Sequence, residues 1–77
     1  MVHMYDIELD GTTGYARCIP ENDDSRMFEM EFDIKEHKVL FVSDPAEFSY
    51  AGKAMSKLCR IYKEKGVLPE TAMSYWV

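Results

Sequence analysis

Apolar and polar side chains alternate through much of the first half of the chain, the pattern of strands that bury one face of a sheet. The clearest example is the segment FEMEFDI at residues 28–34. Its two alternating sets are Phe28, Met30, Phe32 and Ile34, and Glu29, Glu31 and Asp33. An extended strand places these sets on opposite sides. We therefore expect the apolar set in the core and a row of carboxylates on the solvent side.

The same reasoning predicts strands at about 2–9, 14–20, 26–34 and 38–43. The segments between them carry turn residues: DGTTG before the second strand, Pro20 with a polar loop at 21–25 before the third, and KEHK before the fourth. Glycine at both ends of DGTTG permits positive φ, which tight turns need. Short strands joined by short connections favour an antiparallel meander.

A helix is predicted at about 45–65. Asp44 suits the N-cap, Pro45 the first helical position, Glu47 the far side of a capping box, and Gly66 the C-terminal cap. Apolar residues then recur at steps of three and four from Phe48, through Ala51, Met55 and Leu58, to Tyr62, widened by Ala54, Cys59 and Ile61. The expected fold is a single α+β domain over residues 1–77, with the order ββββα.

The last residues, VLPETAMSYWV, are expected to fold back so that Leu68, Met73 and Trp76 cover one edge of the core. A short helical turn beginning at Pro69 is the alternative. The chain also holds more apolar surface than one helix can cover, which favours a homodimer through a sheet margin or an exposed strand edge. This surplus consists of Leu40, Val42, Tyr75, Trp76 and Val77.

Hairpin lengths give a register for the sheet. With Leu9 opposite Gly14, the alternation turns His3 and Tyr5 inward and sets Asp6 beside Arg17 on the outer face. The connection after Pro20 is expected to place Glu29 on the other flank of Arg17. Val2 and Met4 are then expected on the outer side. In the third hairpin, Phe32 is expected to face Phe41 inside. The outer face then holds a set of charged residues that we predict as partner-binding: Asp6, Glu8, Arg17, Glu29, Glu31 and Asp33.

Charge is distributed unevenly along the chain. The net charge of −5 argues against a general nucleic-acid binder. Residues 1–43 carry ten acids and four bases, whereas residues 44–77 carry four acids and five bases. The acidic half is the predicted sheet, and the bases of the second half include one helix face: Lys53, Lys57, Arg60 and Lys63. An acidic sheet opposite a basic helix face is therefore expected.

Cofactor, metal and membrane chemistry find little support. Cys18 and Cys59 lie in apolar patterns without a CxxC or metal-type spacing, so buried free thiols are expected. The loop ENDD at 21–24 lacks the spacing of a calcium loop, and His3 and His37 have no second ligand at a suitable spacing. No apolar run approaches the roughly 20 residues that span a bilayer, and the start is unlike a signal peptide. We expect a soluble cytoplasmic protein without cofactor or metal.

These patterns favour a small non-enzymatic binding or regulatory module. Its acidic sheet face would meet a basic protein partner, since complementary charge speeds and selects association. One alternative is a nucleic-acid-associated regulator that uses the basic helix face, and a second is an inhibitor that mimics nucleic acid. An enzyme with paired carboxylates would need a desolvating cleft, which the open face does not predict. The simplest interpretation is that the outer face is exposed to solvent and has no binding role.

Overall fold

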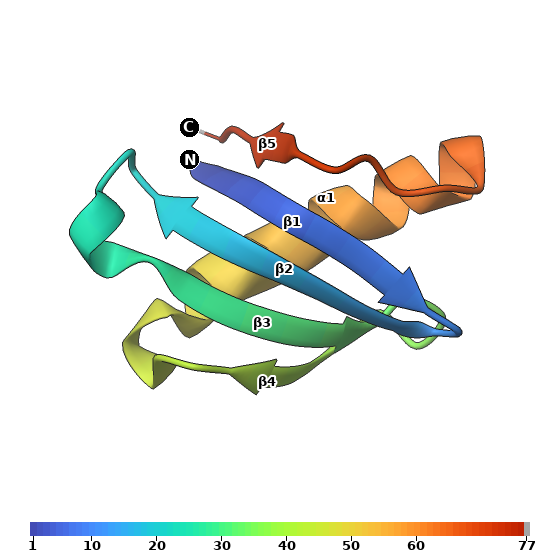
Figure 1. Ribbon diagram of the computed structural model, residues 1–77, viewed down its shortest axis with the longest axis horizontal. Helices are drawn as coiled ribbons and strands as arrows, with labels where there is room; N and C mark the ends of the chain where they lie inside the picture. The colour runs from blue at the N-terminus through green and yellow to red at the C-terminus, as the bar shows by residue number, and fades with distance from the viewer. Residues whose placement is uncertain (77) are drawn as a thin grey trace.

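One antiparallel sheet carries a single long helix on one of its faces, and the other face is uncovered (Figure 1). The computed structural model describes residues 1–76; Val77, part of the predicted surplus apolar surface, lies outside them. The strands are β1 (Val2–Asp10), β2 (Thr13–Pro20), β3 (Phe28–Asp33), β4 (Lys38–Val42) and β5 (Ala72–Ser74). Their order in the sheet is β4-β3-β2-β1-β5. The predicted α+β class is confirmed, and a fifth strand extends the meander.

The helix occupies the predicted range as a short 3-10 turn, η2 (Pro45–Glu47), followed by α1 (Phe48–Lys65). The Asp44 carboxylate accepts a hydrogen bond from the backbone N–H of Ala46, at 3.1 Å, so the predicted N-cap forms. Gly66 ends the helix with φ of 75°, a conformation that favours glycine. The predicted capping box does not form, because Glu47 pairs with Arg26 at the end of a second turn, η1 (Asp24–Arg26).

The core lies between the sheet and α1. Its largest fully buried side chains include Phe28, Phe32, Met4, Met30 and Leu58. Phe48, expected to begin the apolar stripe of the helix, is instead exposed at its first turn. Within residues 1–76, no helix is both long and apolar enough to cross a membrane.

The C-terminal segment folds back as predicted but forms a strand. β5 pairs antiparallel with β1, with His3 opposite Met73. The start of β1 and the strand β5 therefore lie side by side (Figure 1). Leu68 packs against the core. Trp76 remains partly exposed and rests against Tyr50, with 5.6 Å between ring centroids.

β1 contains a bulge that overturns the predicted sidedness of its first half. Asp6 has φ of 50°, and Asp6 and Ile7 together oppose the single residue Ala16, since Tyr5 faces Arg17 and Glu8 faces Tyr15. Val2 and Met4 are therefore buried, and His3 and Tyr5 share the sheet side of Arg17, the reverse of the prediction. The backbone N–H of Ile7 turns to the edge and donates to the carbonyl of Glu70, at 3.1 Å.

A second bulge shifts the register of β4. Phe32 faces Val39 and Glu31 faces Phe41, which leaves Leu40 as the extra residue. Val39 and Val42 pack against the core, whereas Leu40 and Phe41 are exposed. The predicted pairing of Phe32 with Phe41 inside the sheet was wrong, because hairpin counting assumed a regular ladder.

Candidate functional site: the acidic outer face

The sheet face turned away from α1 is built from two neighbouring rows that cross the strands. In one row Tyr5 faces Arg17, and Arg17 faces Glu29; in the next, Glu8 faces Tyr15, and Tyr15 faces Glu31. Strand alternation sends these side chains to the same side. We call this surface the acidic face and define it by Tyr5, Asp6, Glu8, Tyr15, Arg17, Glu29 and Glu31.

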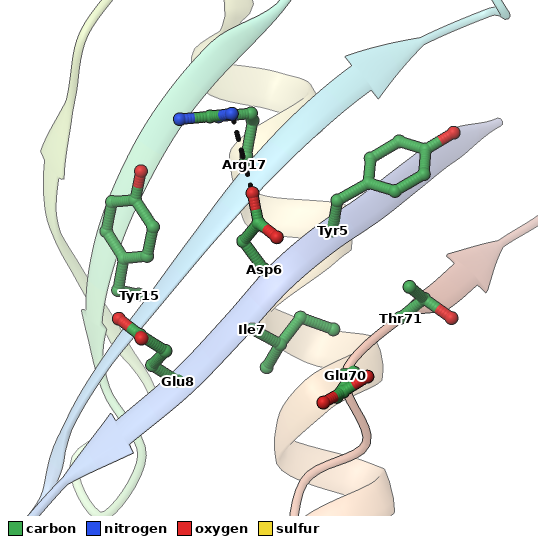
Figure 2. A pocket seen from close by; sticks show the side chains of 8 residues that line it. All are labelled: Tyr5, Asp6, Ile7, Glu8, Tyr15, Arg17, Glu70 and Thr71. Atoms are coloured by element: carbon green, nitrogen blue, oxygen red, sulfur yellow. Dashed lines mark ion pairs between the residues drawn. The ribbon is translucent and has the colours of Figure 1, made fainter.

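Arg17 is the cation at the centre of the acidic face. Its guanidinium lies 3.4 Å from an Asp6 carboxylate oxygen and 3.7 Å from a Glu29 oxygen. Figure 2 shows Arg17 and Asp6 turned toward each other above the sheet. The predicted grouping of Asp6 and Glu29 around Arg17 is confirmed. The bulge lets the Asp6 side chain reach Arg17 although Tyr5 is its register partner.

Glu29 is the most fully engaged acid of this face. The Tyr15 hydroxyl donates to its carboxylate at 2.5 Å. This hydrogen bond to Glu29 is the main reason that the pKa of Tyr15 lies above its ordinary value, with desolvation of the phenol adding to the rise. Tyr15 and Arg17 together hold Glu29 in place, so this carboxylate is preorganised.

Glu8 and Glu31 differ from Glu29, because neither takes part in an ion pair or side-chain hydrogen bond among the residues the structure describes. They flank Tyr15 on either side. Asp33, predicted as part of the same surface, has a structural task instead: its carboxylate accepts from the backbone N–H groups of Lys35 and Glu36, both at 2.9 Å. The predicted set therefore divides into free, paired and turn-forming carboxylates.

A shallow depression of about 540 Å³ opens beside β1 on this face (Figure 2). It is lined by Tyr5, Asp6, Ile7, Glu8, Tyr15, Arg17, Glu70 and Thr71. Glu70 and Thr71 form its rim from the segment before β5 and add one more carboxylate. Tyr5 is held by His3, since the rings stack with centroids 4.3 Å apart and the Tyr5 hydroxyl lies 2.9 Å from His3 Nδ1.

Sequence reasoning missed the aromatic and C-terminal parts of this depression. The outward position of Tyr15 could have been predicted from the sequence, because Tyr15 alternates with the small buried residues Gly14 and Ala16. Tyr5 faces the depression only because of the bulge at Asp6. No local pattern links Glu70 to β1, since their contact is a backbone hydrogen bond across the chain.

The predicted basic helix face lines two depressions. Lys53, Lys57 and Arg60 line a depression of about 190 Å³ together with Tyr75 and Trp76, and Lys53 Nζ lies 5.4 Å from the centroid of the Trp76 ring. Lys63 lines a second depression of about 300 Å³ beside His37, and Arg60 lines both depressions. Exposed aromatic rings therefore accompany three of the four predicted cations.

The remaining reactive groups are poor nucleophiles. Both cysteines are free and buried, as the sequence predicted. Burial raises the pKa of Cys18 to about 12 and also raises that of Cys59, so neither thiol ionises readily. Among residues 1–76, no three His, Cys, Asp or Glu side chains gather closely enough to hold a metal ion.

No family model, curated protein or solved structure matches this chain.

Proposed function

We propose that this protein is a non-enzymatic binding module whose acidic face receives a basic segment of a protein partner. The observation that carries the proposal is the charge of this face. Asp6 and Glu29 lie beside the cation Arg17, Glu8 and Glu31 flank Tyr15 in the next row, and Glu70 lines the depression beside them. Such an excess of one sign attracts a partner of the opposite sign and selects among partners.

The openness of the face supports binding over catalysis. The side chains of Asp6 and Glu29 are 64% and 44% exposed. Carboxylates that act as general acids or bases are usually desolvated in a cleft, which shifts their pKa. The shallow depression gives little such desolvation, and its carboxylates suit direct contact with the side chains of another protein.

Arginine is the expected side chain at the centre of the contact. A guanidinium forms paired hydrogen bonds with a carboxylate and stacks on aromatic rings. Glu8 and Glu31 offer free carboxylates on both sides of the Tyr15 ring. They lie on β1 and β3 with β2 between them, so they are separated by two strand spacings, about 10 Å. A peptide in the polyproline II conformation, with three residues per turn and a rise of about 3.1 Å per residue, matches this distance with cations three residues apart on one side.

The first test uses a synthetic peptide of Arg-Ala-Ala repeats, titrated into the protein and followed by calorimetry at low and physiological salt. Wild type is expected to bind, more weakly at higher salt because exposed charges are screened. Glu8→Lys with Glu31→Lys is expected to weaken binding about tenfold, since it removes two exposed charge pairs of up to about 1 kcal/mol each and replaces them with repulsion.

The matched control is Glu36→Lys with Glu64→Lys, which makes the same change in net charge at exposed positions away from the acidic face. It is expected to retain most of the affinity. Equal loss in both double variants would refute a specific face and indicate attraction by net charge alone. Arg17→Met tests the same proposal through an expected gain of affinity. It releases Asp6 and Glu29 from their cation, and binding is expected to strengthen.

A second candidate function is association with single-stranded nucleic acid through the helix. Tyr75 and Trp76 beside Lys53, Lys57 and Arg60 favour it, because stacking rings and cations are the usual components of such sites. The test is fluorescence anisotropy with labelled oligothymidine at physiological salt. Lys57→Ala with Arg60→Ala is expected to abolish binding, while the Glu8 and Glu31 reversal leaves it intact. Absence of binding by wild type would dismiss this candidate.

A further inference from the structure

The free edge of the sheet at β4 combines exposed backbone with exposed apolar side chains. β4 is the first strand in the sheet order and has a neighbour only on the β3 side. Leu40, Phe41 and Phe48 are 51%, 50% and 58% exposed, and all three line one depression of about 180 Å³ at this edge. An unpaired strand edge is a template for pairing with another strand.

The size of this apolar patch is suited to the centre of an interface. At about 200 Å² for a large side chain, three half-exposed residues leave roughly 300 Å² of apolar surface in contact with water. Patches of this size on monomers are often functional. The smallest stable interfaces bury about 600 Å² on each partner, so the patch supplies about half of that area. Pro45, Lys38 and the strand backbone lie next to it and can supply the rest.

The backbone of β4 fixes which of its groups face outward. The N–H of Ser43 donates to the carbonyl of Glu29 on β3, at 2.9 Å. Backbone groups alternate in direction along a strand. Val42 therefore directs its N–H and C=O away from the sheet, where a second strand can bond to them.

We propose that β4 pairs antiparallel with β4 of a second copy of this chain, forming a two-fold dimer with a continuous sheet of ten strands. Pairing Val42 with Leu40 of the second copy uses the outward backbone groups of Val42 and places Phe41 on the two-fold axis against its own counterpart. The same register sets Lys38 beside Asp44 of the second copy, and the reverse pair forms by symmetry.

Charge complementarity favours the second copy as the occupant of this edge. The segment begins with the cation Lys38 and ends with the anion Asp44. Antiparallel self-pairing brings these opposite charges together twice, whereas parallel self-pairing would align like charges. Lysines and bulges usually protect sheet edges from pairing. Here Lys38 stands at the end of the strand, and the bulge exposes Leu40 and Phe41, two large apolar side chains, at its middle.

The experiment is analytical ultracentrifugation of the full chain over a range of concentrations. Wild type is expected to sediment as a dimer. Phe41→Lys places two lysines on the axis while leaving each next to Glu31 of its own sheet, so the monomer keeps its fold. Its dimer dissociation constant is expected to rise more than about a hundredfold, because apolar contact is lost twice by symmetry. Val67→Lys, at an exposed apolar position outside this patch, is the matched control and should remain dimeric.

A cysteine on the two-fold axis gives a second readout. Directly opposed residues on neighbouring antiparallel strands have Cα atoms about 4.5–5.5 Å apart, within the range of a disulfide. Phe41→Cys is expected to form a covalent dimer on mild oxidation, and Val67→Cys is not. The two native cysteines are buried and contribute little background. Wild type that remains monomeric at millimolar concentration would overturn the proposal, as would a Phe41→Lys variant that dimerises as strongly as wild type.

Discussion

Adding one methyl group at Gly14 is expected to lower the free energy of unfolding strongly. Gly14 lies on β2 opposite Phe32 of β3, and the next register pair along these strands is Tyr15 with Glu31. A Cβ atom at Gly14 would lie 2.2 to 2.7 Å from three ring atoms of Phe32. Carbon atoms in contact are normally about 3.5–4.0 Å apart. The strand or the ring must therefore move by more than about 1 Å to accept alanine.

The expected result of Gly14→Ala is a loss of about 2 kcal/mol in the free energy of unfolding. Replacing glycine within a strand ordinarily gains about 0.5–1 kcal/mol through reduced backbone entropy. Overpacking a core usually costs about 1–3 kcal/mol, and the cost lies at the upper end here because Phe32 is completely buried and cannot swing into solvent. The melting temperature should fall by about 10 °C in a domain of this size. Urea and thermal unfolding followed by circular dichroism measure both quantities.

Gly52 provides the control within the same chain. A Cβ at this helical position would meet nothing within 4 Å. Gly52→Ala is therefore expected to raise the free energy of unfolding by about 1 kcal/mol. Combining Gly14→Ala with Phe32→Leu should recover part of the loss, giving a coupling of about 1 kcal/mol between these neighbours. A Gly14→Ala variant as stable as wild type would show that close packing against Phe32 is not what requires glycine there.

Three further predictions concern the ion pair at the helix start, the β1 bulge and the buried thiols. Arg26→Met should lower the free energy of unfolding in a urea titration by more than Glu47→Gln does, because it leaves a carboxylate that is 8% exposed without its partner. Equal losses would contradict this reasoning. Asp6→Gly should fold normally, whereas Asp6→Val should lose about 1–2 kcal/mol of unfolding free energy, because a β-branched residue is strained at the positive φ of this position. Identical unfolding midpoints for the two variants would argue against a strained bulge. Because burial raises the pKa of Cys18 to about 12, stability from its neutral thiol is complete below pH 9 and is lost as the pH rises toward 12. Mass spectrometry should accordingly find Cys18 and Cys59 unalkylated by iodoacetamide at pH 8 until urea unfolds the chain, and rapid labelling of the folded protein would refute their burial.

The acidic face shows how far local patterns reach into a functional surface. The alternation in β3 correctly predicted that Glu29 and Glu31 leave the core together, and the hairpin correctly predicted Arg17 beside Glu29. The pattern could not distinguish the free carboxylate of Glu31 from the Glu29 carboxylate held by Tyr15, or from Asp33, which closes a turn. Those differences depend on side chains that are neighbours only across strands.

The sequence by itself determined the elements of this protein whose causes are local. Alternation places β2 and β3 and their buried sides, and the caps at Asp44 and Gly66 set the limits of the helix, because each depends on residues within a few positions. The tertiary structure alone decided the sidedness of β1 and the identity of β5. The Ile7 amide bonds to Glu70, far away in the chain, and the bulge that turns Tyr5 toward Arg17 lies at this contact. A strand bulge is stabilised by whatever lies at the sheet edge, and no window of local sequence contains that partner.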